Sequence, residues 1–428
     1  MRDAQVSVKA VVWLFVSILC FSCMEFYVAK IWSADQPPGF SDLFAPWWGA
    51  HELFLHGRNP YTPAVAREIQ TEIYGSPASA TYHGDPSELA GGFAYPLHAA
   101  LLLWPTIFLP FPTVQTIFFL VSILVTLASL WLWLRGFHFN LPWVQLFTLA
   151  FFTLGSFPAA QAIRLQNLSL IAAALLATAI CLLASKHLSL AGIVLALSTF
   201  KPQFCFLLIF WIALWTLSDW RRRQPLAWSF VASMLLLLGT SEWLLPGWFL
   251  YFLRIADAYR HYTFGHSLLD LWFTPHRGPL IAAALFLGVL ALCWRCRRDH
   301  SDSPSFFIAV SLVLAGTVVV IPTLAPHAQL LLLPGFLCLY RYRGALWKST
   351  PLARSSLIAV WLLLAWPWIA VAGLALAAAP VPMRKLLGWW QLPLYASPIL
   401  PLAVLVALGW LTQTRPWIAD QQNASRSL

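Results

Sequence analysis

Charged residues are scarce in this sequence of 428 residues, of which 10% are charged and 60% are hydrophobic. Soluble globular domains carry about 25% charged residues, so the composition excludes a soluble enzyme, a disordered chain and a fibrous protein. The net charge of +10 does not indicate nucleic-acid binding, because the basic residues form short clusters between apolar runs. The composition predicts a multispanning membrane protein whose partners include membrane lipids and no nucleic acid.

The sequence also lacks a disulfide framework. Five of its seven Cys lie inside apolar runs, and Cys293 and Cys296 form a single CxxC motif. A zinc site of this type needs a second pair of ligands, and none is nearby in the sequence. We therefore expect the thiols to pack as small hydrophobic groups. We also expect neither a cofactor nor a metal.

Long apolar runs dominate what is present. A spanning helix needs about 20 apolar residues, and roughly thirteen stretches meet that criterion. The first run, from Val11 to Val28, is too long for a signal peptide and is expected to remain as a span. The stretches begin near Val8, Phe93, Thr113, Leu141, Asn167, Leu188, Pro202, Leu226, Pro279, Ser305, His327, Ala353 and Pro393.

Clusters of Lys and Arg indicate the cytoplasmic ends of the spans. The strongest clusters are 221–223, 295–298 and 341–354, and they share one side if each later stretch crosses once. Both termini belong on that side, which requires an even number of crossings. The stretch 93–112 contains four prolines and is predicted to enter the membrane only in part. One broken span over 188–217 is the alternative.

The predicted fold is all-α: a polytopic membrane protein with about 12 transmembrane helices and one partial or re-entrant element. Two large loops then lie outside, at 32–92 and 246–278. The first holds seven acidic and two basic residues, a net charge of −5 in a basic protein. We divide the chain into a catalytic membrane module, 1–278, and C-terminal helices, 279–428, that complete a lipid-facing groove.

Asp42 is the leading candidate for chemistry, because it follows the first span and precedes a predicted interfacial helix from Phe44 to Leu55. Gly57 is the predicted C-cap of that helix. Two interpretations of Asp42 are open at this point. It caps the helix N-terminus, or it acts as a base at the outer membrane face.

Lys201 interrupts an apolar run, and His327 lies at the boundary of a predicted span. A cation within a membrane segment indicates a functional site, and its partner would be an anion such as a lipid phosphate. The alternative is a Lys that extends to the interface. His327 lies between two prolines and a Gln, and either occupies the interface or binds a phosphate or a sugar hydroxyl.

Three further polar residues, Arg164, Gln166 and Asn167, separate two apolar runs. Arg suits a phosphate, and Gln and Asn suit sugar hydroxyls, although a plain loop has the same composition. The segment Tyr95-Pro96-Leu97-His98 either starts a helix or forms a wall of the site.

These positions carry a resemblance to glycosyltransferase family 87. Asp42 followed by Gly57-Arg58-Asn59-Pro60-Tyr61 is similar to the first-loop pattern of that family. Phe93-Ala94-Tyr95-Pro96 matches its Tyr-Pro element, with Leu97 where a second Pro is common and Trp47-Trp48 where a Tyr is common. Gln166-Asn167, Lys201-Pro202-Gln203 and Pro326-His327 to Leu333-Pro334 follow in the family's order, so the resemblance covers roughly residues 35–340.

The resemblance implies a GT-C-like fold and an inverting sugar transfer at the outer face of the cell membrane. A polyprenyl-phosphate sugar, with mannose preferred among hexoses and pentoses, would be the donor, and a lipid or glycan of the cell envelope would be the acceptor. Asp42 would deprotonate the acceptor hydroxyl. Lys201, Arg164, His327 and Arg260 would bind the donor phosphate. The expected substrate contacts are Asn59, Tyr61, Tyr95, Gln166, Asn167 and Gln203.

Two other functions remain open. A lipid or sugar transporter or flippase would be expected to show inverted repeats, and the sequence has none. A polymerase or ligase of lipid-linked oligosaccharides would be expected to carry a late outer loop rich in Arg, whereas the main loop here is early and acidic.

Overall fold

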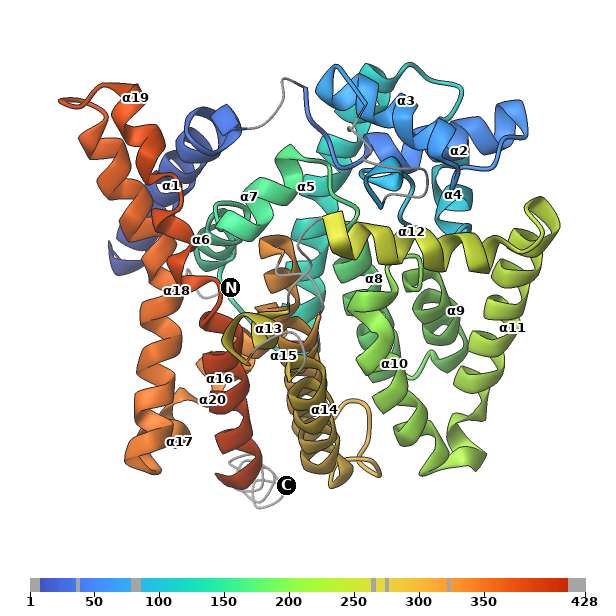
Figure 1. The fold of residues 1–428 in the computed structure, drawn as a ribbon. Coiled ribbons are helices and arrows are strands. Elements are labelled where there is room, and N and C mark those ends of the chain that lie inside the picture. The colour runs from blue at the N-terminus through green and yellow to red at the C-terminus, as the bar shows by residue number, and fades with distance from the viewer. Residues whose placement is uncertain are drawn as a thin grey trace.

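The computed structural model describes residues 8–35, 39–77, 86–262, 267–273, 277–321 and 325–414. Every regular element in these ranges is a helix, which confirms the predicted all-α class. The helices form a bundle capped at one end by short helices, which lie at the top of Figure 1.

The first part of the chain supplies one long helix and most of the cap. Helix α2 ends at His56, and the positive φ of 62° at Gly57 and the N–H bond of Gly57 to the Leu53 carbonyl confirm the predicted C-cap. Helix α4 and the turn η3 fill the predicted partial element, and each is too short to cross a bilayer. The elements are α1 (Val8–Lys30), η1 (Trp32–Asp35), α2 (Phe44–His56), α3 (Pro63–Tyr74), η2 (Pro86–Leu89), α4 (His98–Leu103) and η3 (Trp104–Thr106).

The middle of the chain forms a row of apolar helices. Helices α6 and α7 bend by 65° at their junction, so the stretch predicted from Leu141 is not one straight helix. The elements are α5 (Phe111–Gly136), α6 (Trp143–Leu154), α7 (Phe157–Arg164), α8 (Ser169–Ala184), α9 (Leu188–Ser198), α10 (Pro202–Leu217) and α11 (Trp220–Leu244).

The last part of the chain contributes the central helix. Every residue of α15 from Ser305 to Val319 is buried, and the helix packs against α10, α14 and α20. The stretch predicted from His327 splits into a 3-10 segment and a nine-residue helix. The elements are α12 (Trp248–Tyr262), α13 (Leu268–Phe273), α14 (Gly278–Trp294), α15 (Pro304–Val320), η4 (Pro326–Leu332), α16 (Leu333–Arg341), α17 (Arg343–Lys348), α18 (Pro351–Ala377), α19 (Met383–Leu386), η5 (Leu387–Trp389), η6 (Leu392–Ala396) and α20 (Leu400–Thr414).

Several helices are long and apolar enough to cross a membrane. Among the described residues five qualify, or six if α6 and α7 count as one bent span, and five more apolar helices are shorter. The chain is therefore a multi-pass membrane protein, and the count of about 12 spans stays a prediction. The qualifying segments are Val8–Ala34, Phe111–Gly136, Trp220–Leu244, Pro351–Ala377 and Met383–Thr414.

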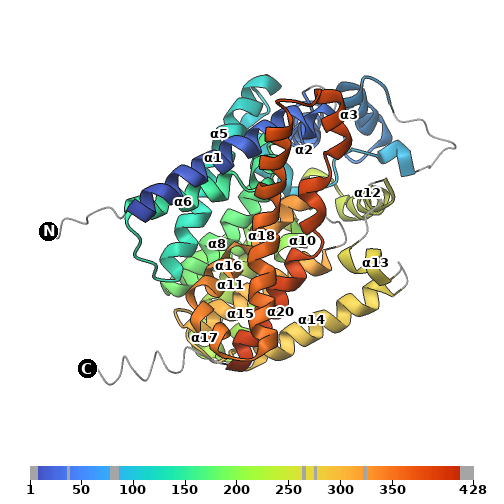
Figure 2. The same ribbon diagram turned by 90° about the vertical axis from the view of Figure 1, so that its left-hand side faces the viewer.

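The basic clusters gather at the end of the bundle opposite the cap (Figure 1). Arg223 donates a 2.8 Å hydrogen bond to the Arg297 carbonyl, which joins two of the clusters. Lys186 lies 3.7 Å from Asp302 at the same end. The two loops predicted to lie outside also meet, because α12 packs against η2, and Figure 2 shows α12 beside the cap.

Candidate functional site

The backbone of Asp42 is fixed to the junction between α7 and α8. Its N–H donates a 2.9 Å hydrogen bond to the Leu165 carbonyl, and the hydroxyl of Ser41 donates to Oε1 of Gln166 at 2.8 Å. Gln166 adopts a positive φ of 49°, which turns the chain between the two helices. Two segments 125 residues apart thus meet at one point.

Asp42 does not cap helix α2. The N-cap residue is Leu43, and no side chain caps this helix N-terminus. The Ser41 hydroxyl accepts from the Leu43 N–H instead, at 3.2 Å. The capping interpretation of Asp42 is therefore wrong, and its carboxylate is directed to other partners.

Asn167 joins Asp42 to Lys201. Its Nδ2 donates a 2.6 Å hydrogen bond to Oδ2 of Asp42, and its Oδ1 accepts a 2.9 Å bond from Nζ of Lys201. A carboxylate can only accept and an ammonium can only donate, so the two partners determine the amide orientation. The side chain places a candidate base and a candidate cation on either side of one amide.

Lys201 is buried, with 5% of its surface exposed. It lies directly before α10, and its ammonium also donates to the hydroxyl of Ser169 at 2.5 Å. The rings of Tyr95 and Phe204 lie 5.9 Å and 5.2 Å from Nζ, within the range of a cation–π interaction. In the described structure, the hydrogen bonds of Lys201 go to neutral groups, and its charge acts on Asp42 across the Asn167 amide without a direct ion pair.

The environment of Asp42 suits a base. Burial raises the pKa of its carboxyl, while the hydrogen bond from Asn167 and the charge of Lys201 lower it in part. A raised pKa makes a carboxylate a stronger proton acceptor than an exposed Asp. The two polar neighbours keep the ionised form accessible.

Tyr95 forms a wall of this site. Burial and the Asp42 carboxylate raise the pKa of its phenol, which keeps the hydroxyl protonated near Asp42. The hydroxyl of Tyr61 donates a 2.8 Å bond to the Tyr95 carbonyl, and Asn59 accepts from the Tyr61 N–H at 2.9 Å. Tyr61 is only 4% exposed, so it positions Tyr95 and offers little surface of its own, whereas Asn59 is half-buried.

His327 reaches the same site from η4. Its ring lies 6.3 Å from that of Phe204, which in turn lies 5.2 Å from Nζ of Lys201. His98, from the Tyr-Pro segment, contacts Thr199 at 3.2 Å, two residues before Lys201. Residues from α4, α8, α10 and η4 therefore surround one region.

Three predicted site residues are not part of this cluster in the described structure. Arg164 is exposed, and its Nε donates to the hydroxyl of Ser33 at 2.8 Å, away from the carboxylate. Gln203 is exposed on the first turn of α10. Arg260 belongs to α12, but its side chain lies outside the described part of the chain.

Two hydroxyl groups of the site, those of Ser41 and Ser169, were not predicted from the sequence. Ser41 precedes Asp42 and bonds Gln166, and Ser169 bonds both Asn167 and Lys201. Each lies within two positions of a predicted residue, which was the only available signal. Buried polar side chains need partners, so neighbouring Ser residues were candidates for that role.

Comparisons with known proteins give one match. The sequence profile of glycosyltransferase family 87 matches residues 93–323, more than half of the chain. No curated protein and no solved structure matches. The matched range includes Tyr95, Asn167 and Lys201, whereas Asp42 precedes it and His327 follows it.

Proposed function

The chain belongs to glycosyltransferase family 87 and is a membrane glycosyltransferase, and we propose that it transfers a sugar from a polyprenyl phosphate to a lipid or glycan acceptor. The sugar is a hexose or a pentose, with mannose preferred. The reaction takes place at the outer face of the cell membrane and inverts the anomeric centre. The linked side chains of Asp42, Asn167 and Lys201 are the observation that carries this proposal.

Asp42 is the general base of the proposed reaction. It takes the proton from the acceptor hydroxyl as that oxygen bonds to the anomeric carbon. The bond from the anomeric carbon to the lipid phosphate breaks, and its electron pair leaves with the phosphate. The transition state has oxocarbenium character, as in glycoside chemistry generally. The raised pKa of Asp42 supports this role.

Lys201 stabilises the departing phosphate. It is a buried cation whose described bonds go to the neutral groups of Asn167 and Ser169, and preorganised charges of this kind stabilise the transition state. We propose His327 as a second phosphate contact because its ring lies near Phe204. Arg164 and Arg260 are proposed as further contacts, which the phosphate would meet from the outer side.

The sugar and the acceptor lie beside Tyr95, Gln166 and Asn167 in this proposal. Tyr95 supports it by presenting a phenol near Asp42. Gln203, on the same turn as Lys201, is the proposed contact for the more exposed part of the substrate. Asn59 and Tyr61 act through the backbone of Tyr95.

A cavity of about 550 Å³ supports a place for the lipid chain of the donor. Apolar residues of α1, α5, α6, α16 and α18 line it, including Trp13, Phe152 and Trp361. Leu330, in the same η4 segment as His327, also lines it. We therefore propose that the C-terminal helices, 279–428, complete a lipid-facing groove for the catalytic module, 1–278.

The proposed topology follows the charge bias. The cap formed by loops 32–92 and 246–278 faces outside, and both termini face the cytoplasm. The span count is about 12, with α4 and η3 in the partial element. The basic clusters at the opposite end of the bundle support this orientation.

A transfer assay in membrane vesicles tests the proposal. Radiolabelled polyprenyl-phosphate mannose and polyprenyl-phosphate arabinose are offered separately to wild type, Asp42→Ala, Asp42→Asn and Asp257→Ala. Asp257 is a matched control, because it belongs to α12 and is exposed. We expect both Asp42 variants to lose about 10²–10⁴-fold in rate, the usual contribution of a general base.

Full activity of a folded Asp42→Asn protein would contradict the base assignment. Absence of transfer from both donors by wild type would overturn the donor assignment. Movement of a labelled lipid across the vesicle without a glycosidic product would support a transporter instead.

A further inference from the structure

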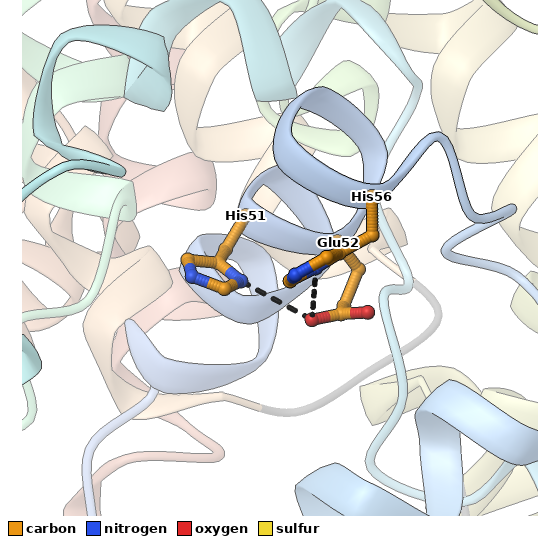
Figure 3. Close-up of side chains that lie close together, drawn as sticks. All are labelled: His51, Glu52 and His56. Carbon is orange, nitrogen blue, oxygen red and sulfur yellow. Dashed lines mark hydrogen bonds and ion pairs between the residues drawn. The ribbon is translucent and has the colours of Figure 1, made fainter.

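Three side chains at the C-terminal end of α2 turn their ligand atoms toward one point (Figure 3). Oε1 of Glu52 lies 3.2 Å from Nδ1 of His51 and 3.1 Å from Nδ1 of His56. All three ligand atoms lie within 4.8 Å of one another. One carboxylate oxygen therefore faces two imidazole nitrogens.

The two separations from Oε1 to the imidazole nitrogens are close to those of a small tetrahedral site. A zinc ion holds His nitrogen and carboxylate oxygen at about 2.0–2.2 Å, which separates two ligand atoms by roughly 3.4 Å. The distances from Oε1 of Glu52 to the two Nδ1 atoms differ from that value by a few tenths of an ångström. The side chain of His56 is 53% exposed, so its ring is free to adjust and a water molecule can reach the fourth position.

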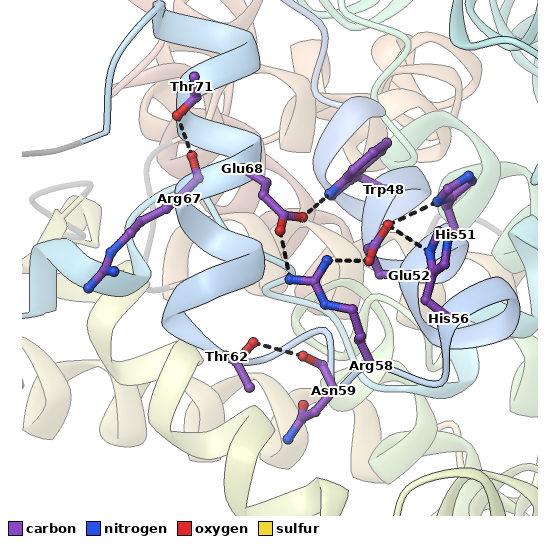
Figure 4. A network of polar contacts seen from close by, with 10 residues as sticks. All are labelled: Trp48, His51, Glu52, His56, Arg58, Asn59, Thr62, Arg67, Glu68 and Thr71. Atoms are coloured by element: carbon purple, nitrogen blue, oxygen red, sulfur yellow. Dashed lines mark hydrogen bonds and ion pairs between the residues drawn. The ribbon is translucent and has the colours of Figure 1, made fainter.

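The carboxylate at the centre is already oriented by a second set of contacts (Figure 4). Oε2 of Glu52 accepts a 2.6 Å bond from Arg58, whose other nitrogen donates to Glu68 at 2.6 Å. Glu68 also accepts from Nε1 of Trp48 at 3.0 Å. The Trp48 ring stacks on His51 with 4.9 Å between centroids. The contacts therefore form a closed ring of side chains: His51, Glu52, Arg58, Glu68 and Trp48.

Such outer contacts are typical of metal sites, where they orient the ligands that bind the ion. The charges also favour a cation. Glu52 and Glu68 carry two negative charges and Arg58 one positive charge, so this group has a net charge of −1 when both His are neutral. Glu52 is only 3% exposed, and its oxygen is shielded from competing water.

We propose that His51, Glu52 and His56 bind one divalent transition-metal ion of the zinc class, with water as the fourth ligand. With the ion bound, each neutral imidazole would carry its proton on Nε2, so that both Nδ1 lone pairs and Oε1 of Glu52 face the ion. It fixes the C-terminal end of α2 where the chain turns at Gly57. Glu52 lies eight residues beyond Phe44, roughly 12 Å along the helix axis, so the ion does not take part in the reaction at Asp42.

Zinc binding to the purified full chain tests this site without any activity measurement. The protein is prepared in detergent, freed of its affinity tag and treated with a chelator. Zn²⁺ is then titrated by calorimetry, and bound zinc is counted by elemental analysis. The variants are His56→Gln, His51→Gln with His56→Gln, and the control His300→Gln, an exposed His beyond the α14 helix at the opposite end.

We expect one tightly bound equivalent in wild type and in His300→Gln. His56→Gln should bind at least tenfold more weakly, and the double variant should lose the equivalent. Because the His56 side chain is half exposed, its loss does not disturb the core. Co²⁺ added in place of Zn²⁺ should give the visible absorption of a tetrahedral site in wild type and in His300→Gln. The two variants that lack a His ligand should not show this absorption.

Two results would overturn the proposal. Wild type that binds no zinc at micromolar concentration would show that the cluster is an ion-pair network only. Unchanged binding by the double variant would assign the metal to other residues, such as Cys293 and Cys296.

Discussion

Asn167 donates a 2.6 Å hydrogen bond to Asp42, which precedes it by 125 residues. The contact joins the loop after the first span to the start of α8, on which the position of Lys201 also depends. One amide therefore sets both the direction of the carboxylate and its distance from the cation.

The pH dependence of transfer should report the ionisation of Asp42. Burial raises the pKa of this carboxyl, and a base acts only when ionised. The rate constant kcat/KM should therefore fall as the pH drops through that raised pKa, at a higher pH than an exposed Asp would give. Asn167→Ala removes a hydrogen bond that lowers the pKa, so its acid limb should move to still higher pH. It should also lose about 10- to 100-fold in activity, since a hydrogen bond to a charged group contributes roughly 1.5–3 kcal/mol.

The matched control is Gln203→Ala, which changes an exposed amide on α10. It should alter KM more than the position of the acid limb. Profiles of pH dependence that coincide for wild type and Asn167→Ala would contradict the role of Asn167 in holding Asp42.

Lys201→Gln should reduce transfer by about 10²–10³-fold, the usual loss for one electrostatic contact to the developing charge. If Lys201 contacts the phosphate, its loss removes an interaction that the loss of Asn167 leaves in place, in addition to the support that both residues give to Asp42. The double variant with Asn167→Ala should then lose more than either single variant, and KM for the donor should rise. Lys186→Gln, at the opposite end of the bundle, should leave both the transfer rate and the KM for the donor unchanged.

A purely positioning role for Lys201 predicts another result. The double variant would then lose no more than Asn167→Ala alone, because both changes remove the same support of Asp42. That outcome would contradict the phosphate assignment and leave the base assignment intact.

The helices were largely predictable from the sequence, because apolar length and proline position act locally. The predicted start near Val8 and the cap at Gly57 agree with the structure. The bend between α6 and α7 and the split at His327 were not predicted, although a proline in the first turn of α7 and of α16, Pro158 and Pro334, is a local signal for both breaks.

The site was predicted as a set of residue types but not as a geometry. Asp42, Asn167 and Lys201 were singled out separately, and nothing in one sequence shows that an amide joins them. The sequence likewise gives no indication that Arg164 donates a hydrogen bond to Ser33. The spacing of His51, Glu52 and His56 matches no standard motif such as H-E-x-x-H, so only the fold brings their ligand atoms together.

Arg58→Gln should destabilise the cap. Glu52 is 3% exposed and would lose its charged partner, and an unsatisfied buried polar group costs about 1–3 kcal/mol.

Burial alone would raise the pKa of Glu68, but the hydrogen bonds from Arg58 and Trp48 lower it below its usual value. The Arg58–Glu68 pair therefore stabilises the fold at pH values above the pKa of a Glu in the unfolded chain. This stabilisation should be lost as the pH falls through the lowered pKa of Glu68.

Thermal unfolding of the detergent-purified protein measures the effect. Arg254→Gln, which changes an exposed Arg of α12, is the control and should unfold like wild type. At neutral pH the melting temperature of Arg58→Gln should be lower, and the difference should shrink in acid. Equal melting temperatures at neutral pH would show that the network adds no stability.

The orientation of the bundle can be tested by cysteine labelling in intact cells. Thr71 is exposed on α3 in the cap, and Arg222 is exposed beside the Arg223–Arg297 contact at the opposite end. With a maleimide that does not cross membranes, Thr71→Cys should react in intact cells, and Arg222→Cys only after permeabilisation. Wild type gives the background, since its described thiols are buried or half-buried. Reaction of Arg222→Cys alone in intact cells would invert the topology and place Asp42 on the cytoplasmic side, where an acceptor outside the cell could not reach it.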